Sequence, residues 1–338
     1  MGWFHFSGHS SAVFVHRVNK FSRLSYNIRI RQDILYRIRL LSFCHLPHLL
    51  ITQGIKILQY PGFDSIALQL GPVAIRWYGL MYLIGFAAAW YLLRRRASQP
   101  GAVVPVGKVD DLLFYCAVGV IVGGRLGYML FYNFGQVVDN PLNLLKIWQG
   151  GMSFHGGFLG VAVATWLFVR RHLDCTWWQL NDFVAPMACL GLGAGRIGNF
   201  INGELWGRPG NVPWAFQVDC TDSHFADLCF RQLQLPPGTL LTPPLHPSPL
   251  YEAALEGFLL FALLWIFSSR PRPTGAVTGV FLLGYGASRF AVEMIRLPDS
   301  HIDYLAFGWV TMGHVLSFPM IVGGILLLLL AYRRHAVE

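Results

Sequence analysis

Charged and polar side chains within otherwise apolar stretches are the residues of this chain that could do chemistry. The most informative stretch is residues 191–207, where Arg196 follows a run of glycines and apolar residues. An unpaired charge inside a membrane costs about 2.5–3.5 kcal/mol, so Arg196 needs a partner or a function. On a helix Arg196 and Asn199 share a face, and Glu204 follows just beyond. The spacing therefore predicts a polar site at one membrane boundary, rather than a structural ion pair.

A second polar stripe follows a later helix. Tyr285, Arg289 and Glu293 are spaced by four residues in an apolar segment. Arg289 and Glu293 could simply neutralise each other. Because Arg196 and Arg125 add two more arginines, we expect arginines to outnumber the carboxylates that could pair with them. Two guanidiniums at one cavity favour a bidentate or doubly charged anion, and phosphate is the natural one.

A histidine among glycines is the third candidate group. His155 lies within residues 150–160, which contain five glycines. The plain interpretation is a histidine bonded to a neighbouring carbonyl. The flanking glycines favour the alternative, because they would give a substrate room to reach the ring.

Composition decides which elements must position these groups. The chain has 338 residues, of which 54% are hydrophobic and only 13% charged, so we expect a polytopic membrane protein. We predict an all-α fold of about seven transmembrane helices, with residues 203–249 inserted outside the membrane between the fourth and fifth helices. The predicted spans are about 73–93, 112–132, 152–169, 180–201, 250–268, 276–295 and 310–332.

The charge distribution separates the chain into two parts. The net charge is +9, but residues 1–56 hold eight basic residues and one acidic residue, so the remainder carries only +2. A nearly neutral body gives no reason to expect nucleic acid as a partner. The extension has no long apolar run, so it is not a signal peptide. It could be a basic arm on a membrane surface or sequence from an upstream start that the cell does not use.

Basic residues in the loops orient the predicted bundle. Ten lie on one side and four on the other, which places the start of the first span outside and the C-terminus in the cytoplasm. A +7 extension on the outer side contradicts the same rule. We therefore predict that residues 1–57 are not part of the mature protein, that the enzyme domain is 58–334, and that it begins near residues 50–60.

Cysteines and histidines bear on metals and on disulfides. Cys220 and Cys229 both lie in the outer segment 203–249, where an oxidising compartment permits a disulfide, and we predict one. The chain has no paired Cys-x-x-Cys and its histidines are scattered, so we expect no metal. We expect no cofactor either.

Several longer motifs carry a resemblance to a known family. These segments are Arg76–Gly79, Gly123–Tyr128 with Phe131–Asn133, Gly151–Gly160, Gly191–Gly207, His246–Ser248 with Leu250–Glu252, and Gly284–Arg289. Through them the chain resembles the prolipoprotein diacylglyceryl transferases from about residue 60 to 334. It departs from the family pattern at Arg76, where histidine is common, and at Pro249, where glutamine is common.

The resemblance implies a bacterial inner-membrane enzyme with its active site toward the periplasm. Such an enzyme moves the diacylglyceryl group of phosphatidylglycerol to the lipobox cysteine of a prolipoprotein, forming a thioether and releasing glycerol phosphate. The implied partners are phosphatidylglycerol, prolipoprotein signal peptides and membrane lipids. The implied catalytic residues are His155, Arg289 and Tyr78. The implied substrate-binding residues are Arg196, Asn199, Glu204, Gly207, Tyr285, Glu293 and Tyr132.

The chemistry of this reaction suits the residues. Negative charge builds on the departing phosphate, and fixed cations such as Arg196 and Arg289 would stabilise it. His155 is the candidate base for the thiol, and Glu204 is expected to hold Arg196 or the outer loop. A transporter or lipid flippase would also carry intramembrane arginines, but it predicts internal repeats that the sequence lacks. An anchored receptor has no use for two buried arginines.

Overall fold

The computed structural model describes residues 57–71, 73–147, 151–298 and 304–336. The chain divides into two units, residues 1–55 and 56–338. The predictions for the basic extension fall almost wholly on residues outside those described. The described residues all lie in the second unit.

Four short strands precede or interrupt the helices. Strands β1 (Leu58–Gln59) and β4 (Phe216–Gln217) pair in parallel, whereas β2 (Ile66–Leu70) and β3 (Val73–Arg76) form an antiparallel hairpin. The first span was predicted to start at residue 73, and that boundary is wrong. Gly71 turns the chain with a positive φ of 58°, so the next residues pair with β2 before a helix can begin.

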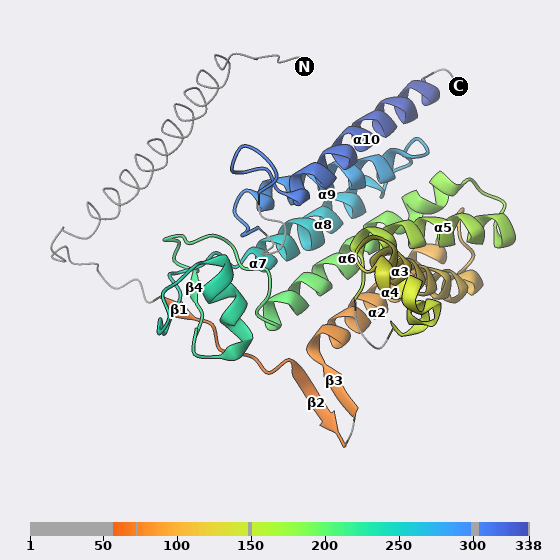
Figure 1. Cartoon of the computed structure of the whole chain (residues 1–338). Coiled ribbons are helices and arrows are strands. Elements are labelled where there is room, and N and C mark those ends of the chain that lie inside the picture. The colour runs from red at the N-terminus through yellow and green to blue at the C-terminus, as the bar shows by residue number, and fades with distance from the viewer. Residues whose placement is uncertain (1–56, 72, 148–150, 299–303, 337–338) are drawn as a thin grey trace, which may run out of the picture. The chain divides into compact units, whose positions relative to one another are not determined.

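Long helices account for most of the remaining chain (Figure 1). Each of the seven predicted intervals overlaps one long helical segment. Six of these are single helices: α2 (Trp77–Ala97), α3 (Val109–Phe131), α5 (Phe154–His172), α6 (Trp177–Ile201), α9 (Ala276–Glu293) and α10 (Met312–His335). The seventh is a continuous run of α7 (Ser248–Glu252), the π-helical stretch η6 (Ala253–Leu259) and α8 (Leu260–Phe267).

Shorter helical turns lie in the connections. They are η1 (Val106–Lys108), α4 (Phe134–Asp139), η2 (Pro141–Leu145), η4 (Ser223–Phe225) and η5 (Asp227–Gln232).

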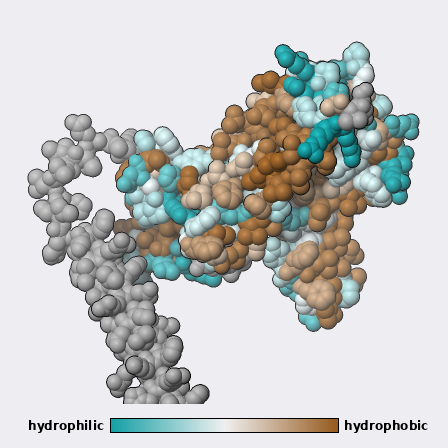
Figure 2. All heavy atoms as spheres, turned by 90° about the horizontal axis from the view of Figure 1, so that it is seen from above, coloured by the Kyte–Doolittle hydropathy of each residue, from teal (hydrophilic) through white to brown (hydrophobic). Residues whose placement is uncertain are grey.

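Four of the described helical segments are long and apolar enough to cross a membrane. Figure 2 shows hydrophobic residues gathered over much of the visible face, with hydrophilic residues at its edges. Large apolar side chains such as Phe114 and Ile266 are mostly exposed, as expected of a protein whose solvent is lipid. The four segments are Val106–Phe131, Trp177–Ile201, Ser248–Phe267 and Met312–His335.

Glycines bring helices into backbone contact at two places that matter for the site. In the α3–α5 pair, a Cβ on Gly127 would lie 2.7 Å from the Gly156 Cα, so no side chain fits between them. In the α6–η6 pair, a Cβ on Gly193 would lie 2.9 Å from the Gly257 Cα. Small residues at such crossings let membrane helices approach closely.

The outer segment 203–249 has a small core of its own around Trp206, Phe225 and Leu245. Cys220 and Cys229 form the predicted disulfide there. Tyr60, next to β1, packs into the same core and donates its hydroxyl proton to the Ile201 carbonyl at 2.7 Å. Burial raises the pKa of Tyr60 to about 12, which keeps this donor protonated. The bond ties Tyr60 to the end of α6, where the segment 203–249 begins.

Candidate active site

Arg196 lies between two glutamates from the next helical segment. Its Nε is 3.1 Å from Oε2 of Glu252 and 3.4 Å from Oε2 of Glu256. The Tyr285 hydroxyl of α9 also contacts the Arg196 guanidinium. Three elements, α6, α7–η6 and α9, therefore meet at one arginine.

Arg289 extends these contacts along α9. It pairs with Oε1 of Glu252 through Nη1, and its Nη2 lies 2.7 Å from Oε2 of Glu293. The Nη1 atom of Arg296 lies 3.6 Å from the same Glu293 oxygen. We call these six residues the ion-pair network: Arg196, Glu252, Glu256, Arg289, Glu293 and Arg296.

The members of the network differ in how deeply their side chains are buried. The side chains of Glu252 and Glu256 are 0% exposed, whereas those of Arg196 and Arg289 are 17% and 13% exposed. The carboxylates are thus buried more deeply than the arginine side chains. A buried charge is tolerated only when it is paired, so the carboxylates hold the arginines in place, while part of each arginine side chain stays accessible.

The network corrects one premise drawn from the sequence. Arginines do not outnumber carboxylates here, because Glu252 and Glu256 pair with the arginines that were expected to lack partners. Neither glutamate was predicted as a site residue. The signal was present: two glutamates four residues apart share one face of an otherwise apolar helix.

The π-helical stretch η6 lies at the centre of the site. Glu252 is the last residue of α7, and Glu256 lies within η6. Single π-helical turns are rare and often mark functional sites. Gly257 of η6 contacts Gly193 of α6 directly, which brings Glu256 within ion-pair distance of Arg196.

A second group of predicted residues gathers at the C-terminal end of α6. The Asn199 amide donates to Oε2 of Glu204 at 3.1 Å, and Asn202 donates to Oε1 at 3.3 Å. Glu204 therefore connects the start of the outer segment to the end of α6, as one of its two predicted roles requires. The other predicted partner, Arg196, pairs with Glu252 and Glu256 instead. Tyr78 of α2 packs beside Gly198 and places its hydroxyl 3.3 Å from that of Tyr82.

Gly207 lies where the outer segment meets the end of α9. Its N–H donates to the His246 carbonyl at 2.8 Å, and it forms a β-bridge with Arg296. A Cβ there would lie 2.9 Å from the His246 carbonyl oxygen. Close backbone packing thus explains why this position is a glycine.

His155 and Tyr132 lie on the α3–α5 pair and are not members of the ion-pair network. His155 is exposed in the first turn of α5, and Tyr132 ends α3 and stacks on Tyr128. Two of the glycines near His155 lie in close contacts. Gly156 packs against the backbone of α3, and Gly151 lies against the ring of Tyr128.

Arg125 is buried on the same side but does not belong to the network. Its Nη2 donates to the Asn143 carbonyl at 2.7 Å, and its Nε donates to the Leu144 carbonyl at 3.4 Å. It therefore fixes the segment between α3 and α5.

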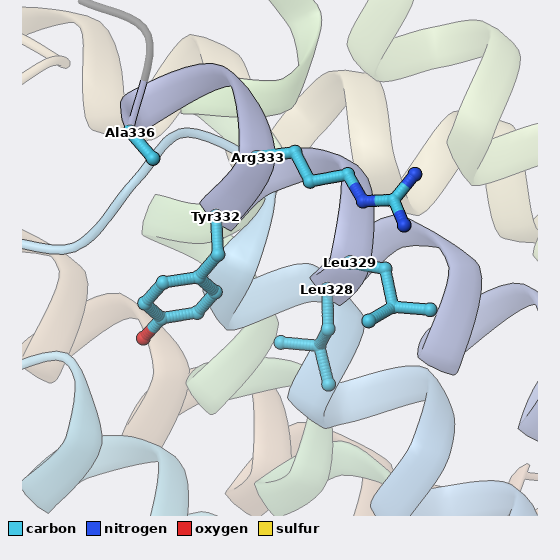
Figure 3. Close-up of a pocket in the computed structure, with 5 residues that line it drawn as sticks. All are labelled: Leu328, Leu329, Tyr332, Arg333 and Ala336. Atoms are coloured by element: carbon cyan, nitrogen blue, oxygen red, sulfur yellow. The ribbon is translucent and has the colours of Figure 1, made fainter.

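A shallow apolar pocket of about 420 Å³ lies at the far end of α10. Leu328, Leu329, Tyr332, Arg333 and Ala336 line it (Figure 3). At 1.5 Å per residue, its nearest residue is roughly 25 Å along the helix from Thr311, which lies beside the network. The pocket and the candidate site are therefore separate.

Comparisons with known proteins show the family of this chain. The model of the prolipoprotein diacylglyceryl transferase family matches residues 65–330. A phosphatidylglycerol–prolipoprotein diacylglyceryl transferase of Pseudomonas fluorescens is 53% identical over 278 residues, which are 82% of this chain and 97% of that protein. Enzymes of the same name from Solidesulfovibrio magneticus and Pseudomonas aeruginosa are 54% and 50% identical, over 80% and 83% of this chain and 95% and 98% of their own. The chain belongs to the prolipoprotein diacylglyceryl transferase family.

Proposed function

We propose that this protein transfers the diacylglyceryl group of phosphatidylglycerol to the lipobox cysteine of prolipoproteins, the first step of lipoprotein maturation. The names of the relatives state both substrates. The observation that carries the proposal is a pair of partly exposed arginine side chains, Arg196 and Arg289, held by the single buried carboxylate of Glu252. Such a pair suits a phosphate group.

The reaction develops negative charge on the leaving phosphate, which the two arginines can stabilise. The cysteine sulfur bonds to the terminal glyceryl carbon of the lipid, and the bond from that carbon to the phosphate oxygen breaks. Glycerol phosphate leaves with the electron pair of the broken bond, so negative charge grows on its oxygens. Arg196 and Arg289 stabilise this charge without reorganising, because Glu252 already fixes both guanidiniums. Glu293 holds Arg289 from the other side.

The remaining predicted residues take supporting roles in this proposal. His155 removes the thiol proton, and its exposed position at the start of α5 supports that role. Tyr78, Asn199 and Tyr285 orient lipid oxygens, with Tyr285 already in contact with Arg196. Glu204, Gly207 and Tyr132 bind substrate.

We further propose a seven-span topology in the bacterial inner membrane. The seven long helical segments and the basic residues of alternate loops support it. The segment 203–249 then lies in the periplasm, where its disulfide is stable. The active site faces the periplasm, the C-terminus is cytoplasmic, and signal peptides of prolipoproteins approach from within the membrane.

A reconstituted transfer assay tests the proposal. Purified protein is mixed with vesicles containing phosphatidylglycerol and with a lipobox peptide, and the mass of the peptide is measured. We expect the wild-type protein to add one diacylglyceryl group, and a peptide with serine in place of cysteine to stay unmodified.

The same assay tests the arginine pair. Arg196→Ala and Arg289→Ala are each expected to lose transfer while the protein still inserts. Arg231→Ala, which removes only an exposed ion pair with Asp227, serves as the matched control and stays active. Unmodified cysteine peptide with the wild-type protein would overturn the proposal.

A further inference from the structure

The first turn of α10 contacts the ion-pair network at Glu293. The Thr311 hydroxyl, which caps this helix, donates to Oε1 of Glu293 at 2.7 Å. A Cβ on Gly313 would lie 2.6 Å from each oxygen of the same carboxylate. The carboxylate therefore occupies the space that any other residue at 313 would fill, at the N-terminus of a 24-residue helix. The helix dipole favours an anion there.

His314 determines the direction of the Thr311 proton. Its Nδ1 accepts the Thr311 backbone N–H at 3.2 Å, and its Nε2 lies 3.3 Å from the sulfur of Met294. The single lone pair of Nδ1 is taken by that N–H, so the Thr311 hydroxyl, whose oxygen lies 3.1 Å from Nδ1, has the Glu293 carboxylate as its acceptor. The hydroxyl proton is directed to Glu293. The ring is 3% exposed and packs against Phe290 and Trp309, which fixes its orientation.

Helix capping alone does not account for this arrangement. A threonine that served only as a cap would satisfy N–H groups of its own first turn. Here its hydroxyl reaches a carboxylate on α9, and a glycine two residues later makes room for that carboxylate. Glu293 in turn holds Nη2 of Arg289 at 2.7 Å. The contacts form one continuous path from α10 to the arginine that faces the phosphate.

We propose that Thr311, Gly313 and His314 are positioning residues for the transfer reaction, which fix Glu293 and through it the orientation of Arg289. The proposal rests on the proposed function above. None of the three contacts the reacting atoms. Their effect is to keep the Arg289 guanidinium aligned with the charge that develops as the phosphate leaves.

Substitution of Thr311 tests the path. Thr311→Val keeps the size of the side chain but leaves a buried carboxylate oxygen without its hydrogen bond. We expect kcat to fall roughly ten- to a hundredfold, with a smaller change in KM for phosphatidylglycerol, because Arg289 stays charged but is misaligned. Thr311→Ser restores the hydroxyl and should return most of kcat. Thr165→Val is the matched control, since Thr165 is equally buried and hydrogen-bonded but lies on α5.

A double-mutant cycle separates positioning from general stability. If Thr311 acts through Glu293, Thr311→Val should cost little further activity in a Glu293→Gln protein, whereas effects on stability alone would multiply. Should Thr311→Val fail to insert, the same cycle with Gly313→Ala gives the answer. Wild-type kcat in Thr311→Val, or independent effects in the cycle, would overturn the inference. Absence of transfer by the wild-type protein would instead overturn the proposed function.

Discussion

Two regions of the molecule bury arginines in different ways. Between α6 and α9, Arg196 and Arg289 pair with glutamates that are fully buried. Between α3 and α5, Arg125 is satisfied by backbone carbonyl oxygens of the connecting segment. The first arrangement fixes a guanidinium while part of the arginine side chain stays accessible. In the second arrangement the guanidinium donates its hydrogen bonds to backbone carbonyl oxygens, which fixes the path of a loop. A buried arginine indicates a function only when its partners are known.

The glycines of the two regions differ in the same manner. On the α3–α5 pair they let the two helix backbones touch over several turns. On the α6–η6 pair one contact, between Gly193 and Gly257, brings a carboxylate to an arginine. Glycines thus bring charged side chains together in the α6–η6 pair, whereas in the α3–α5 pair they serve helix packing.

The largest effect is expected where one carboxylate serves two arginines. Glu252→Gln removes the charge shared by Arg196 and Arg289, and breaking a buried pair costs about 3–5 kcal/mol. We expect transfer to be lost and the thermal unfolding temperature in detergent to fall. Asp227→Asn removes one carboxylate of an exposed pair and should change stability by less than about 1 kcal/mol. Equal effects of the two substitutions would remove the distinction between buried and exposed pairs.

Replacing arginine by lysine in each region sharpens the comparison. Arg289 pairs with two glutamates through two different nitrogens, and a single ammonium cannot reproduce that fork. We expect Arg289→Lys to lower kcat/KM about a hundredfold, or about 2.7 kcal/mol. Arg125→Lys should lower the transfer rate per inserted molecule far less, because backbone carbonyl oxygens can also accept hydrogen bonds from a lysine ammonium. Wild-type rates in Arg289→Lys would contradict the phosphate role.

The disulfide tests how far the site depends on the outer segment. Replacing both Cys220 and Cys229 by serine should lower stability by about 2–3 kcal/mol, because a closed ring of this length restricts the unfolded chain. Transfer by the folded protein should be largely kept, since the ion-pair network lies on helices. Maleimide labelling of denatured, unreduced protein checks the bond, and reaction of both thiols would disprove it.

The smallest effect is expected at the α3–α5 crossing. A methyl group on Gly160 would overlap the Gly119 backbone, so Gly160→Ala should cost about 1–3 kcal/mol. Gly157→Ala is the matched control, because its Cβ would lie 3.6 Å from the nearest atom, an ordinary contact. Thermal unfolding compares the two, and kcat should be unchanged in both. A fall in kcat for Gly160→Ala alone would mean that this region also positions the chemistry.

The sequence by itself determined the features that depend on residues near one another in the chain. Arg289 and Glu293 pair as their spacing of four predicts, because helix geometry places such residues on one face. The disulfide followed from two cysteines in one segment. The helical class and most helix positions followed from long apolar runs, since lipid leaves a helix as the simplest way to satisfy the backbone.

Only the tertiary structure decided which helix faces meet. Spacing along α6 suggested that Arg196 would join Glu204, but the Gly193–Gly257 contact turns Arg196 toward Glu252 and Glu256 instead. The partners of Arg125 depend on the path of a loop, and the role of Thr311 depends on where α10 begins beside Glu293. Contacts between distant segments are set by packing of whole helices, and no local pattern of residues encodes that packing.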